Sequence, residues 1–488
     1  MAEVDSGAVS LTAATNISRD EMTVMRPLLT FLFVVVVSFA VPSDSRRESE
    51  LTKLLDAALD RHSTARRTTV TLKVLDLATG EVLYDRGGER LLTPASNLKI
   101  YTSACAIDLF GPKHRFQTIV KCTGPIANGV LDGNLALVGG GDAMLSHADL
   151  ATLADRVVKE LGIKQIRGEV VVDNSRYASP LKGPGWMWDD DPQSYNMSIT
   201  PLMVDFNVLE LQLTPTVNSF EAKLLLPSSY PALKLVRRKV LPDKVLAMRH
   251  PFTHPILVAK KATLDKKKKL KITMLNPRKW VQGVFTAMLK ERGVQFSPTE
   301  SATANSQDAQ QLEHLGPTLA TTLKRFNHKS ENAVGEVLLH EIAIAKGTSK
   351  PKWADGAKAI TTWLIETAGL EKDSFRIVDG SGLSRYDLIS ADSSVRLLKY
   401  MHSHEHAETF YDALKPYEFE IDGKKRKLIA AKPCGMGSVS TISGYLTTLD
   451  GRKLAFSLLA NGYIGSAKPV FGLREDVWRI LAQYDGNK

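Results

Sequence analysis

Residues 94–102 read Pro94-Ala95-Ser96-Asn97-Leu98-Lys99-Ile100-Tyr101-Thr102 and open an apolar segment. The pattern predicts a helix from Asn97 to Phe110, which Gly111-Pro112 ends. Apolar residues lie almost all round this helix, as expected of a helix buried inside a domain. We therefore expect the rest of one domain to pack around it.

Ser96 and Lys99 lie at Ser-x-x-Lys spacing at the start of this helix. Residues three apart share a helix face, which places the ammonium group over the hydroxyl. A serine hydroxyl needs a base to become a nucleophile, and burial lowers the pKa of a lysine enough for it to serve. The alternative is a capping serine beside a lysine that reaches out to solvent. The motif alone does not separate the two.

A second polar group, Ser330-Glu331-Asn332, falls in a break between two predicted helices. Ser330 could relay a proton to a leaving amine, and Asn332 could hydrogen-bond a substrate amide. The competing interpretation is helix capping, since Ser or Asn before Ala333 is a favourable N-cap.

A third candidate is Lys432, in Ala431-Lys432-Pro433-Cys434-Gly435, just before a predicted pair of strands. A cation fixed on a strand would hold a substrate carboxylate. Backbone N–H groups on that strand edge could join the N–H of Ser96 as an oxyanion hole.

In this order the three groups resemble the Ser-x-x-Lys, Ser-x-Asn and Lys-Thr-Gly set of penicillin-binding proteins and serine β-lactamases. The flanking sequences are similar to D-alanyl-D-alanine carboxypeptidases of the low-molecular-mass class C type, peptidase family S13. The long gap between Lys99 and Ser330 also fits, because that family carries its extra domains there. The segments that carry this resemblance are 94–102, Asp379–Arg385, Ser443–Leu446, and Pro184-Gly185-Trp186 with Tyr195 and Asn207.

The resemblance implies a role for each matching residue. Ser96 would attack a D-Ala-D-Ala or cross-link peptide bond, and Lys99 would accept its proton. Ser330 and Lys432 would deliver a proton to the leaving amine, and Asn332 would orient the substrate. The N–H groups of Ser96 and Gly435 would form the oxyanion hole. A pocket for the stem-peptide side chain would be lined by Asp190, Tyr195, Arg385 and Met436. The alternative is that these four have only structural roles, as a surface Asp, a core Tyr, a loop Arg and a core Met.

One departure from the family pattern lies at Lys432-Pro433-Cys434, where Lys-Thr-Gly is expected. The Thr hydroxyl that would bind a substrate carboxylate is missing, and Pro433 has no N–H to donate. Cys434 adds a side chain where Gly lets the substrate approach closely. Activity is then expected to be weak or to favour endopeptidase cleavage. Lys432 is placed by its distance from Ser443.

The order of helix and strand patterns predicts one α/β domain interrupted by a long insertion. By resemblance, the main domain is of the penicillin-binding and serine β-lactamase type, an antiparallel sheet flanked by helices. We predict that this domain comprises residues 41–114 and 283–488, that residues 115–282 form a β-rich insertion, and that residues 1–40 are an N-terminal extension with a signal peptide.

The N-terminus has the pattern of an export signal: Arg26, the apolar run Leu28–Val37, and the small-residue segment Ser38-Phe39-Ala40. The run is shorter than the roughly 20 residues of a membrane span. We expect export to a periplasm or cell envelope, with Met22 or Met25 as the start. An uncleaved signal, the alternative, would give the only membrane contact.

The net charge of +10 favours acidic partners such as a cell-wall polymer. No nucleic-acid motif accompanies it, so no nucleic-acid partner is expected. The run of lysines between Lys260 and Lys269 fits a solvated loop or hairpin tip. Cys105, Cys122 and Cys434 form neither a disulfide framework nor a zinc site, and pairing of the first two stays open. No metal or cofactor is expected.

The leading hypothesis is a D,D-carboxypeptidase and endopeptidase that acts on peptidoglycan stem peptides and is inhibited by β-lactam antibiotics. A β-lactamase or esterase on the same scaffold is a second hypothesis. It is weaker because β-lactamases lack a large insertion between the first two motifs. A third is a catalytically weakened relative that binds cell wall without turnover, which Pro433 and Cys434 motivate.

Overall fold

The structure is a computed structural model. It describes residues 49–486 apart from 179, 192, 218–219, 227–232, 237–246, 250–255, 260–265 and 298–309. The described residues belong to one compact unit. The predicted signal peptide and residues 260–265 of the lysine-rich stretch lie outside the described residues.

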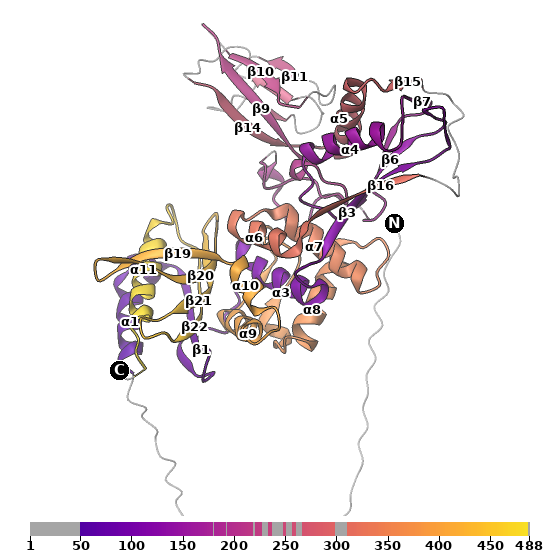
Figure 1. The fold of residues 1–488 in the computed structure, drawn as a ribbon. Coiled ribbons are helices and arrows are strands. Elements are labelled where there is room, and N and C mark those ends of the chain that lie inside the picture. Colours follow the sequence, from indigo (N-terminus) through magenta and orange to yellow (C-terminus); the bar gives the residue numbers. More distant parts are fainter. Residues whose placement is uncertain are drawn as a thin grey trace, which may run out of the picture. The chain divides into compact units, whose positions relative to one another are not determined.

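A six-stranded antiparallel sheet in the order β19-β20-β21-β22-β1-β2 forms the centre of the main domain (Figure 1). Two of its strands come from the start of the chain and four from its end, so the sheet joins the two predicted parts of this domain. The strands are β1 (Thr69–Asp76), β2 (Val82–Arg86), β19 (Lys415–Ile421), β20 (Lys424–Met436), β21 (Val439–Thr447) and β22 (Lys453–Asn461).

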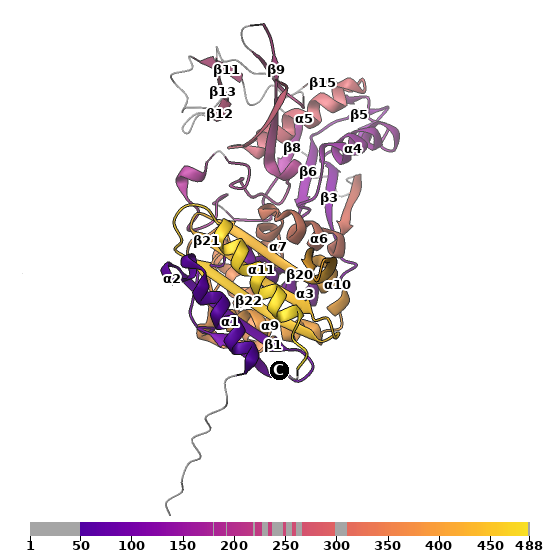
Figure 2. The same ribbon diagram turned by 90° about the vertical axis from the view of Figure 1, so that its left-hand side faces the viewer.

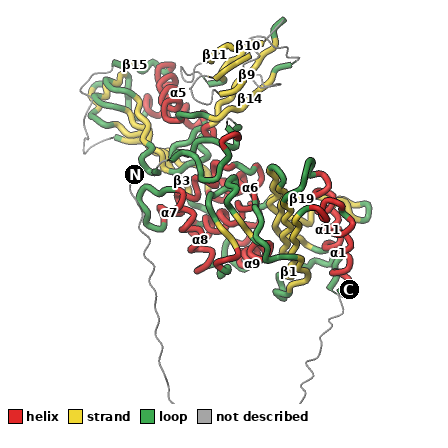
Figure 3. The backbone as a smooth tube through the Cα atoms, turned by 180° about the vertical axis from the view of Figure 1, so that it is seen from behind, coloured by secondary structure: helices red, strands yellow, loops and turns green. Residues whose placement is uncertain are grey.

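Helices cover both faces of this sheet, which explains why β21 and β22 are buried over almost their whole length. Helices α1 (Glu50–Arg61) and α11 (Lys468–Ala482) pack together on one face (Figure 2). A second group of helices of this domain lies on the opposite side (Figure 3). They are α3 (Lys99–Phe110), α6 (Leu319–Lys329), α7 (Asn332–Ala345), α8 (Trp353–Glu366), α9 (Ala391–His402) and α10 (Ala407–Ala413).

Short elements complete this domain: α2 (Ser63–Arg67), the 3₁₀ turns η1 (Ala95–Leu98) and η5 (Lys372–Ser374), and the two-stranded sheet of β17 (Phe375–Arg376) and β18 (Leu388–Ile389). The antiparallel sheet between two helical layers confirms the predicted α/β fold class.

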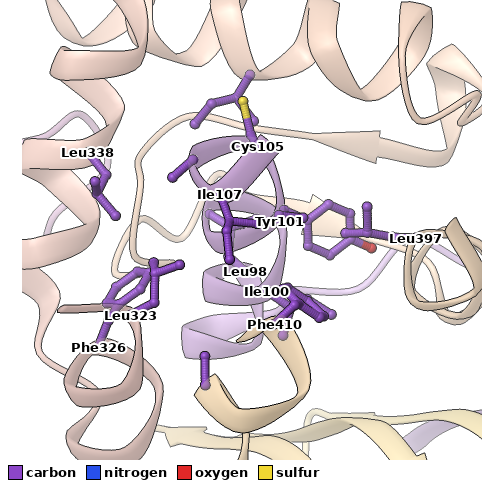
Figure 4. Packing of buried hydrophobic residues seen from close by; sticks show 14 of the residues in the cluster. Leu98, Ile100, Tyr101, Cys105, Ile107, Leu323, Phe326, Leu338, Leu397 and Phe410 are labelled. Carbon is purple, nitrogen blue, oxygen red and sulfur yellow. The ribbon is translucent and has the colours of Figure 1, made fainter. Parts of the chain in front are cut away.

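Helix α3 is the buried helix that the sequence predicts. Apolar side chains on several sides of it contact α6, α7, α9 and α10 (Figure 4). Full burial of one such side chain contributes roughly 1.5–3 kcal/mol. The helix ends at Gly111, whose φ of 73° is readily adopted only by glycine. This packing fixes the first turn of α3, where Lys99 lies.

The β-rich part of the chain has its own hydrophobic core. Among the described residues of this part are two four-stranded sheets, two three-stranded sheets and two α-helices. The elements are β3 (Arg115–Cys122), β4 (Ile126–Ala127), β5 (Val130–Leu131), β6 (Leu135–Gly140), α4 (His147–Lys159), β7 (Gln165–Ile166), β8 (Val170–Asp173), η2 (Trp188–Asp190), η3 (Asp205–Asn207), β9 (Val208–Pro215), β10 (Phe220–Leu224), β11 (Leu233–Val236), β12 (Ala247–Arg249), β13 (Ile256–Ala259), β14 (Lys268–Thr273), α5 (Pro277–Glu291), β15 (Gln295–Phe296) and β16 (Gln311–Thr318).

The packing of this insertion continues past residue 282, where the sequence predicts its end. Helix α5 buries Trp280 and Phe285 in the core of the β-rich part. Strand β16 then pairs with β3. We therefore propose that the insertion runs from Arg115 to Thr318, because those residues share one core and one set of sheets.

Cys105 and Cys122 are free thiols in different hydrophobic cores. Both are fully buried, and burial raises the pKa of each thiol. They fill core space and do not pair. In the part of the chain that the structure describes, no helix is long and apolar enough to cross a membrane.

Candidate active site

Ser96 lies on the 3₁₀ turn η1, one residue after Ala95, whose φ is 47°. A non-glycine residue with positive φ is strained, and such residues gather at functional sites. Lys99 is the first residue of α3. Its Nζ lies 2.8 Å from the Ser96 Oγ. The Ser-x-x-Lys spacing therefore does bring the two side chains together.

The Lys99 ammonium makes two further hydrogen bonds in a buried site. It donates to Asn332 Oδ1 and to the backbone oxygen of Ser381, each at 2.8 Å. The side chain is 0% exposed, and burial lowers the pKa of Lys99 to about 8. Two fixed acceptors hold two N–H groups, so the neutral amine would direct its lone pair at the Ser96 hydroxyl.

Ser330, Glu331 and Asn332 form the junction between α6 and α7. Ser330 ends α6 in the left-handed conformation, with φ 59° and ψ 40°. Glu331, and not Ser330 or Asn332, occupies the N-cap position of α7, and it makes no side-chain capping bond. The Ser330 and Asn332 side chains instead contact the two lysines, so the helix-capping alternative does not describe them.

Lys432 lies on β20, where it pairs with Ser443 of β21. Its Nζ donates to Ser330 Oγ and to the backbone oxygen of Pro433, both at 3.0 Å. The side chain is 1% exposed. Burial, together with the nearby charge of Lys99, lowers the pKa of Lys432 to about 7.

Two walls enclose the site. Ser96, Lys99 and Asn332 form the first wall, and the free edge of β20 forms the second. Strand β19 pairs with β20 only up to Ala431, and β21 pairs with the other edge. Proline is tolerated in a sheet where its nitrogen faces an open edge. The nitrogen of Pro433 therefore points away from β21, and so does that of Gly435, because backbone direction repeats every two residues.

Three of the four predicted pocket residues are linked by contacts to the site or its free edge. Tyr195 Oη donates to Asp190 Oδ1 at 2.7 Å, and the Tyr195 backbone oxygen accepts from Asn332 Nδ2 at 3.0 Å. Arg385 Nη1 donates to the backbone oxygen of Gly437, just after β20, at 3.1 Å. Met436 is the last residue of β20 and is half-buried. Tyr195 is 44% exposed, so the alternative interpretation of it as a core tyrosine is wrong.

The loop Asp379–Gly382 is a part of the site to which sequence reasoning gave no role. The Asp379 carboxylate accepts hydrogen bonds from the backbone N–H groups of Ser381 and Gly382 and from Trp186 Nε1. A Cβ on Gly382 would lie 1.9 Å from the Ala95 backbone oxygen. Glycine is thus required where the loop touches the Ser96 turn. Backbone carbonyls carry no sequence signal, although the quoted segment 379–385 pointed to this loop.

Asn97 is a second residue that sequence reasoning missed. Its Nδ2 donates to the backbone oxygen of Lys432 at 2.7 Å, and its Oδ1 accepts from Ser443 Oγ at 2.9 Å. The side chain is fully buried. It ties the Ser96 turn to β20 and so fixes the distance between the two walls.

A cavity of about 680 Å³ adjoins the Ser330–Asn332 junction. Tyr195, Arg325 and Lys329 line it together with residues of the insertion. Among the residues that the structure describes, no cluster of three or more His, Cys, Asp or Glu is arranged to hold a metal ion.

The geometry places a serine, two buried lysines and an asparagine around one strand edge, and comparison with known proteins gives this arrangement a family. The model of the D-Ala-D-Ala carboxypeptidase 3 (S13) family matches residues 51–472. The chain belongs to this family. It is therefore a D-Ala-D-Ala carboxypeptidase of the serine peptidase class, a hydrolase.

Two curated relatives are similar to this chain over most of its length. The D-alanyl-D-alanine carboxypeptidase of Actinomadura sp. (strain R39) is 29% identical over 495 residues, which cover 95% of this chain and 90% of the relative. DacB of Haemophilus influenzae is 25% identical over 455 residues, covering 88% of this chain and 91% of the relative. The crystal structure of penicillin binding protein 4 from H. influenzae matches with a TM-score of 0.74 at 22% identity, over 88% of this chain and 99% of that one. This structural match confirms the fold.

Proposed function

We propose that this S13 protein cleaves D-Ala-D-Ala and D-Ala cross-link peptide bonds through an acyl-enzyme on Ser96. The observation that carries the proposal is the 2.8 Å contact between Lys99 Nζ and Ser96 Oγ. The other two contacts of Lys99 are with hydrogen-bond acceptors, which leaves its lone pair for the serine.

In the first step the Ser96 Oγ–H proton passes to the neutral Lys99 amine while Oγ bonds to the substrate carbonyl carbon. The carbonyl π pair moves onto oxygen. Because burial lowers the pKa of Lys99 to about 8, roughly a tenth of the molecules hold the neutral base at pH 7. Burial thus supplies a base that a solvent-exposed lysine would not provide.

The negative oxygen formed in this step needs N–H donors. We assign the N–H of Ser96 and that of Gly435, which faces the free edge of β20. Donors held by a fixed backbone stabilise the developing charge without reorganisation. Asn97 keeps this spacing, because it ties the turn to the strand.

Collapse of the tetrahedral intermediate re-forms the carbonyl and breaks the C–N bond. The leaving amine takes a proton from Lys432 through Ser330, whose Oγ lies 3.0 Å from Lys432 Nζ, and the proton that Lys99 received from Ser96 replaces it on Lys432, so that both lysines return to their starting states. Asn332 holds Lys99 and the Tyr195 backbone, and its predicted contact with a substrate amide stays a prediction. Water then loses a proton to the neutral Lys99 amine as it attacks the acyl carbon, and Lys99 returns that proton to the departing Ser96 Oγ when the second tetrahedral intermediate collapses.

The substrate class that we propose is the peptidoglycan stem peptide. Asp190, held by Tyr195 Oη, presents a carboxylate suited to the free amine of a diamino acid. Arg385 and Met436 complete that pocket. β-Lactams would acylate Ser96 as inhibitors, and the protein would work after export to a periplasm or cell envelope. No cofactor is required by these steps.

The direct test is D-alanine release from a synthetic stem peptide that ends in D-Ala-D-Ala, and cleavage of a cross-linked dimer. Purified wild-type protein should release D-alanine or split the dimer, and Ser96→Ala should do neither. Ser175→Ala, at a serine in the insertion, is the matched control and should keep full activity. Equal turnover by Ser96→Ala and wild type would reject Ser96 as the nucleophile.

A further inference from the structure

The Cys434 thiol lies on one of the two N–H groups that we assign to the oxyanion hole. The Ser96 N–H donates to Cys434 Sγ at 2.6 Å. The Cys434 side chain thereby occupies the Ser96 N–H, at the place where the carbonyl oxygen of the substrate has to bind.

The backbone on both sides of this contact is held in place. Asn97 Nδ2 binds the backbone oxygen of Lys432 at 2.7 Å, and Thr441 Oγ1 binds that of Pro94 at 2.7 Å. Thr441 also pairs with Cys434 across β20 and β21. Sliding the strand would break these bonds, so the thiol can leave the hole only by turning about χ1.

The surroundings allow that rotation. Cys434 is half-buried, on the part of β20 whose outer edge is free. Cysteine side chains occupy staggered χ1 wells, so a move to another well takes the sulfur away from the Ser96 N–H without moving the backbone. A Cβ on Gly435, next along the strand, would meet the Val439 backbone oxygen at 3.7 Å, an ordinary van der Waals contact.

We propose that Cys434 is a gating residue, whose thiol closes the oxyanion hole in the resting enzyme and has to rotate out before Ser96 can be acylated. This inference rests on the proposed function. Only molecules with the thiol turned out can react, so the observed acylation rate falls in proportion to their fraction. Carbonyl compounds that bind too weakly to displace the thiol would be excluded, which makes Cys434 a determinant of specificity as well as rate.

The test is the rate of Ser96 acylation by a fluorescent penicillin in Cys434→Gly, Cys434→Ala and Cys434→Ser. Cys434→Gly and Cys434→Ala both remove the sulfur and should be acylated roughly 10- to 100-fold faster than wild type. This gain does not exceed the rate effect of a single oxyanion-hole donor. Cys434→Ser keeps a hydrogen-bond acceptor, because its Oγ lies on a slightly shorter bond from Cβ than Sγ does and still reaches the Ser96 N–H. Its acylation rate should stay within about 3-fold of wild type.

Two controls separate gating from general effects. Cys122→Ala removes a buried thiol from the insertion core and should leave the acylation rate unchanged. Melting temperatures show whether each variant is folded. Rates for Cys434→Ala and Cys434→Gly equal to that of labelled wild type would overturn the inference but keep the proposed function. Fast acylation of Cys434→Gly together with slow acylation of Cys434→Ala would also overturn the inference, because the Cβ and not the thiol would then be the obstacle. Failure of every folded variant to label would reject the proposed function together with the gate.

Discussion

The two walls of the active site differ in how closely they follow the family pattern and in how they are occupied. On one wall, Ser96, Lys99 and Asn332 are joined by short hydrogen bonds around a buried amine. On the other, β20 presents Lys432 followed by Pro433 and Cys434, where the family has Thr and Gly. The Cys434 thiol contacts the first wall at the Ser96 N–H.

This difference separates two tasks of the enzyme. The first wall holds what activates the nucleophile, and nothing in it departs from the family pattern. We propose that the second wall binds the substrate carboxylate and carbonyl oxygen, and there two side chains differ from the family pattern. We expect substitutions on the first wall to abolish chemistry, and substitutions on the second to tune binding and rate in either direction.

The largest effect is expected from Lys99→Met. Removing the amine takes away the base for Ser96 and leaves the acceptors on Asn332 and Ser381 buried without a partner. Acylation by penicillin should fall by about 1000-fold. Lys113→Met, at an exposed lysine just after α3, is the control and should react like wild type. Acylation of Lys99→Met within about 10-fold of wild type would show that another group is the base.

A smaller loss is expected from Asn332→Ala. Asn332 Oδ1 holds one N–H of Lys99, and a hydrogen bond to a charged group contributes about 1.5–3 kcal/mol, or roughly 10- to 150-fold in rate. Asn327→Ala is the matched control: Asn327 is also buried, but its amide binds Ser103 Oγ and a backbone oxygen of its own helix. It should lower the melting temperature and leave kcat near wild type. Equal kcat losses in the two variants would indicate a structural role only.

Much of the first wall could be predicted from sequence, because the pairing of Ser96 with Lys99 depends only on helical spacing and burial. Lys432 was selected from the sequence by its distance along the chain from Ser443, but that spacing did not predict that the two residues pair across β20 and β21. Contacts that are made through backbone groups could not be predicted. The Ser381 carbonyl beside Lys99 and the Cys434 thiol on the Ser96 N–H arise from tertiary packing that no local pattern records.

The end of the insertion shows the same limit. The spacing of apolar residues in α5 predicts an amphipathic helix, but periodicity does not tell which core the apolar face joins. In the structure, that face packs into the insertion core.

The pH profile sharpens the comparison, because each wall contributes one lysine. Burial lowers the pKa of Lys99 to about 8, and a base works above its pKa, so its contribution to the rate increases with pH up to about 8. Burial lowers the pKa of Lys432 to about 7, and a proton donor works below its pKa, so its contribution decreases above about 7. Hydrolysis of the peptide should therefore be fastest between these values and fall about 10-fold per pH unit on each side. A profile that stays flat below the lower value and above the higher one would contradict the assignment of both lysines.

The smallest effect is expected from Pro433→Thr on the second wall. The new hydroxyl would add one hydrogen bond to the substrate carboxylate, about 0.5–1.5 kcal/mol, or roughly 2- to 12-fold in kcat/KM for a peptide that ends in D-Ala-D-Ala. Cleavage of a cross-linked dimer with an amidated C-terminus should not change. An equal gain for both substrates would mean that Pro433 acts on the strand and not on carboxylate recognition.

The central claim is that Ser96 forms a covalent acyl-enzyme. It is tested most directly by incubating the protein with benzylpenicillin and mapping the modified peptide by mass spectrometry. The account predicts one added penicilloyl group on the peptide that contains Ser96, and none in Ser96→Ala. A penicilloyl group at another residue, or folded wild-type protein that stays unmodified, would contradict it.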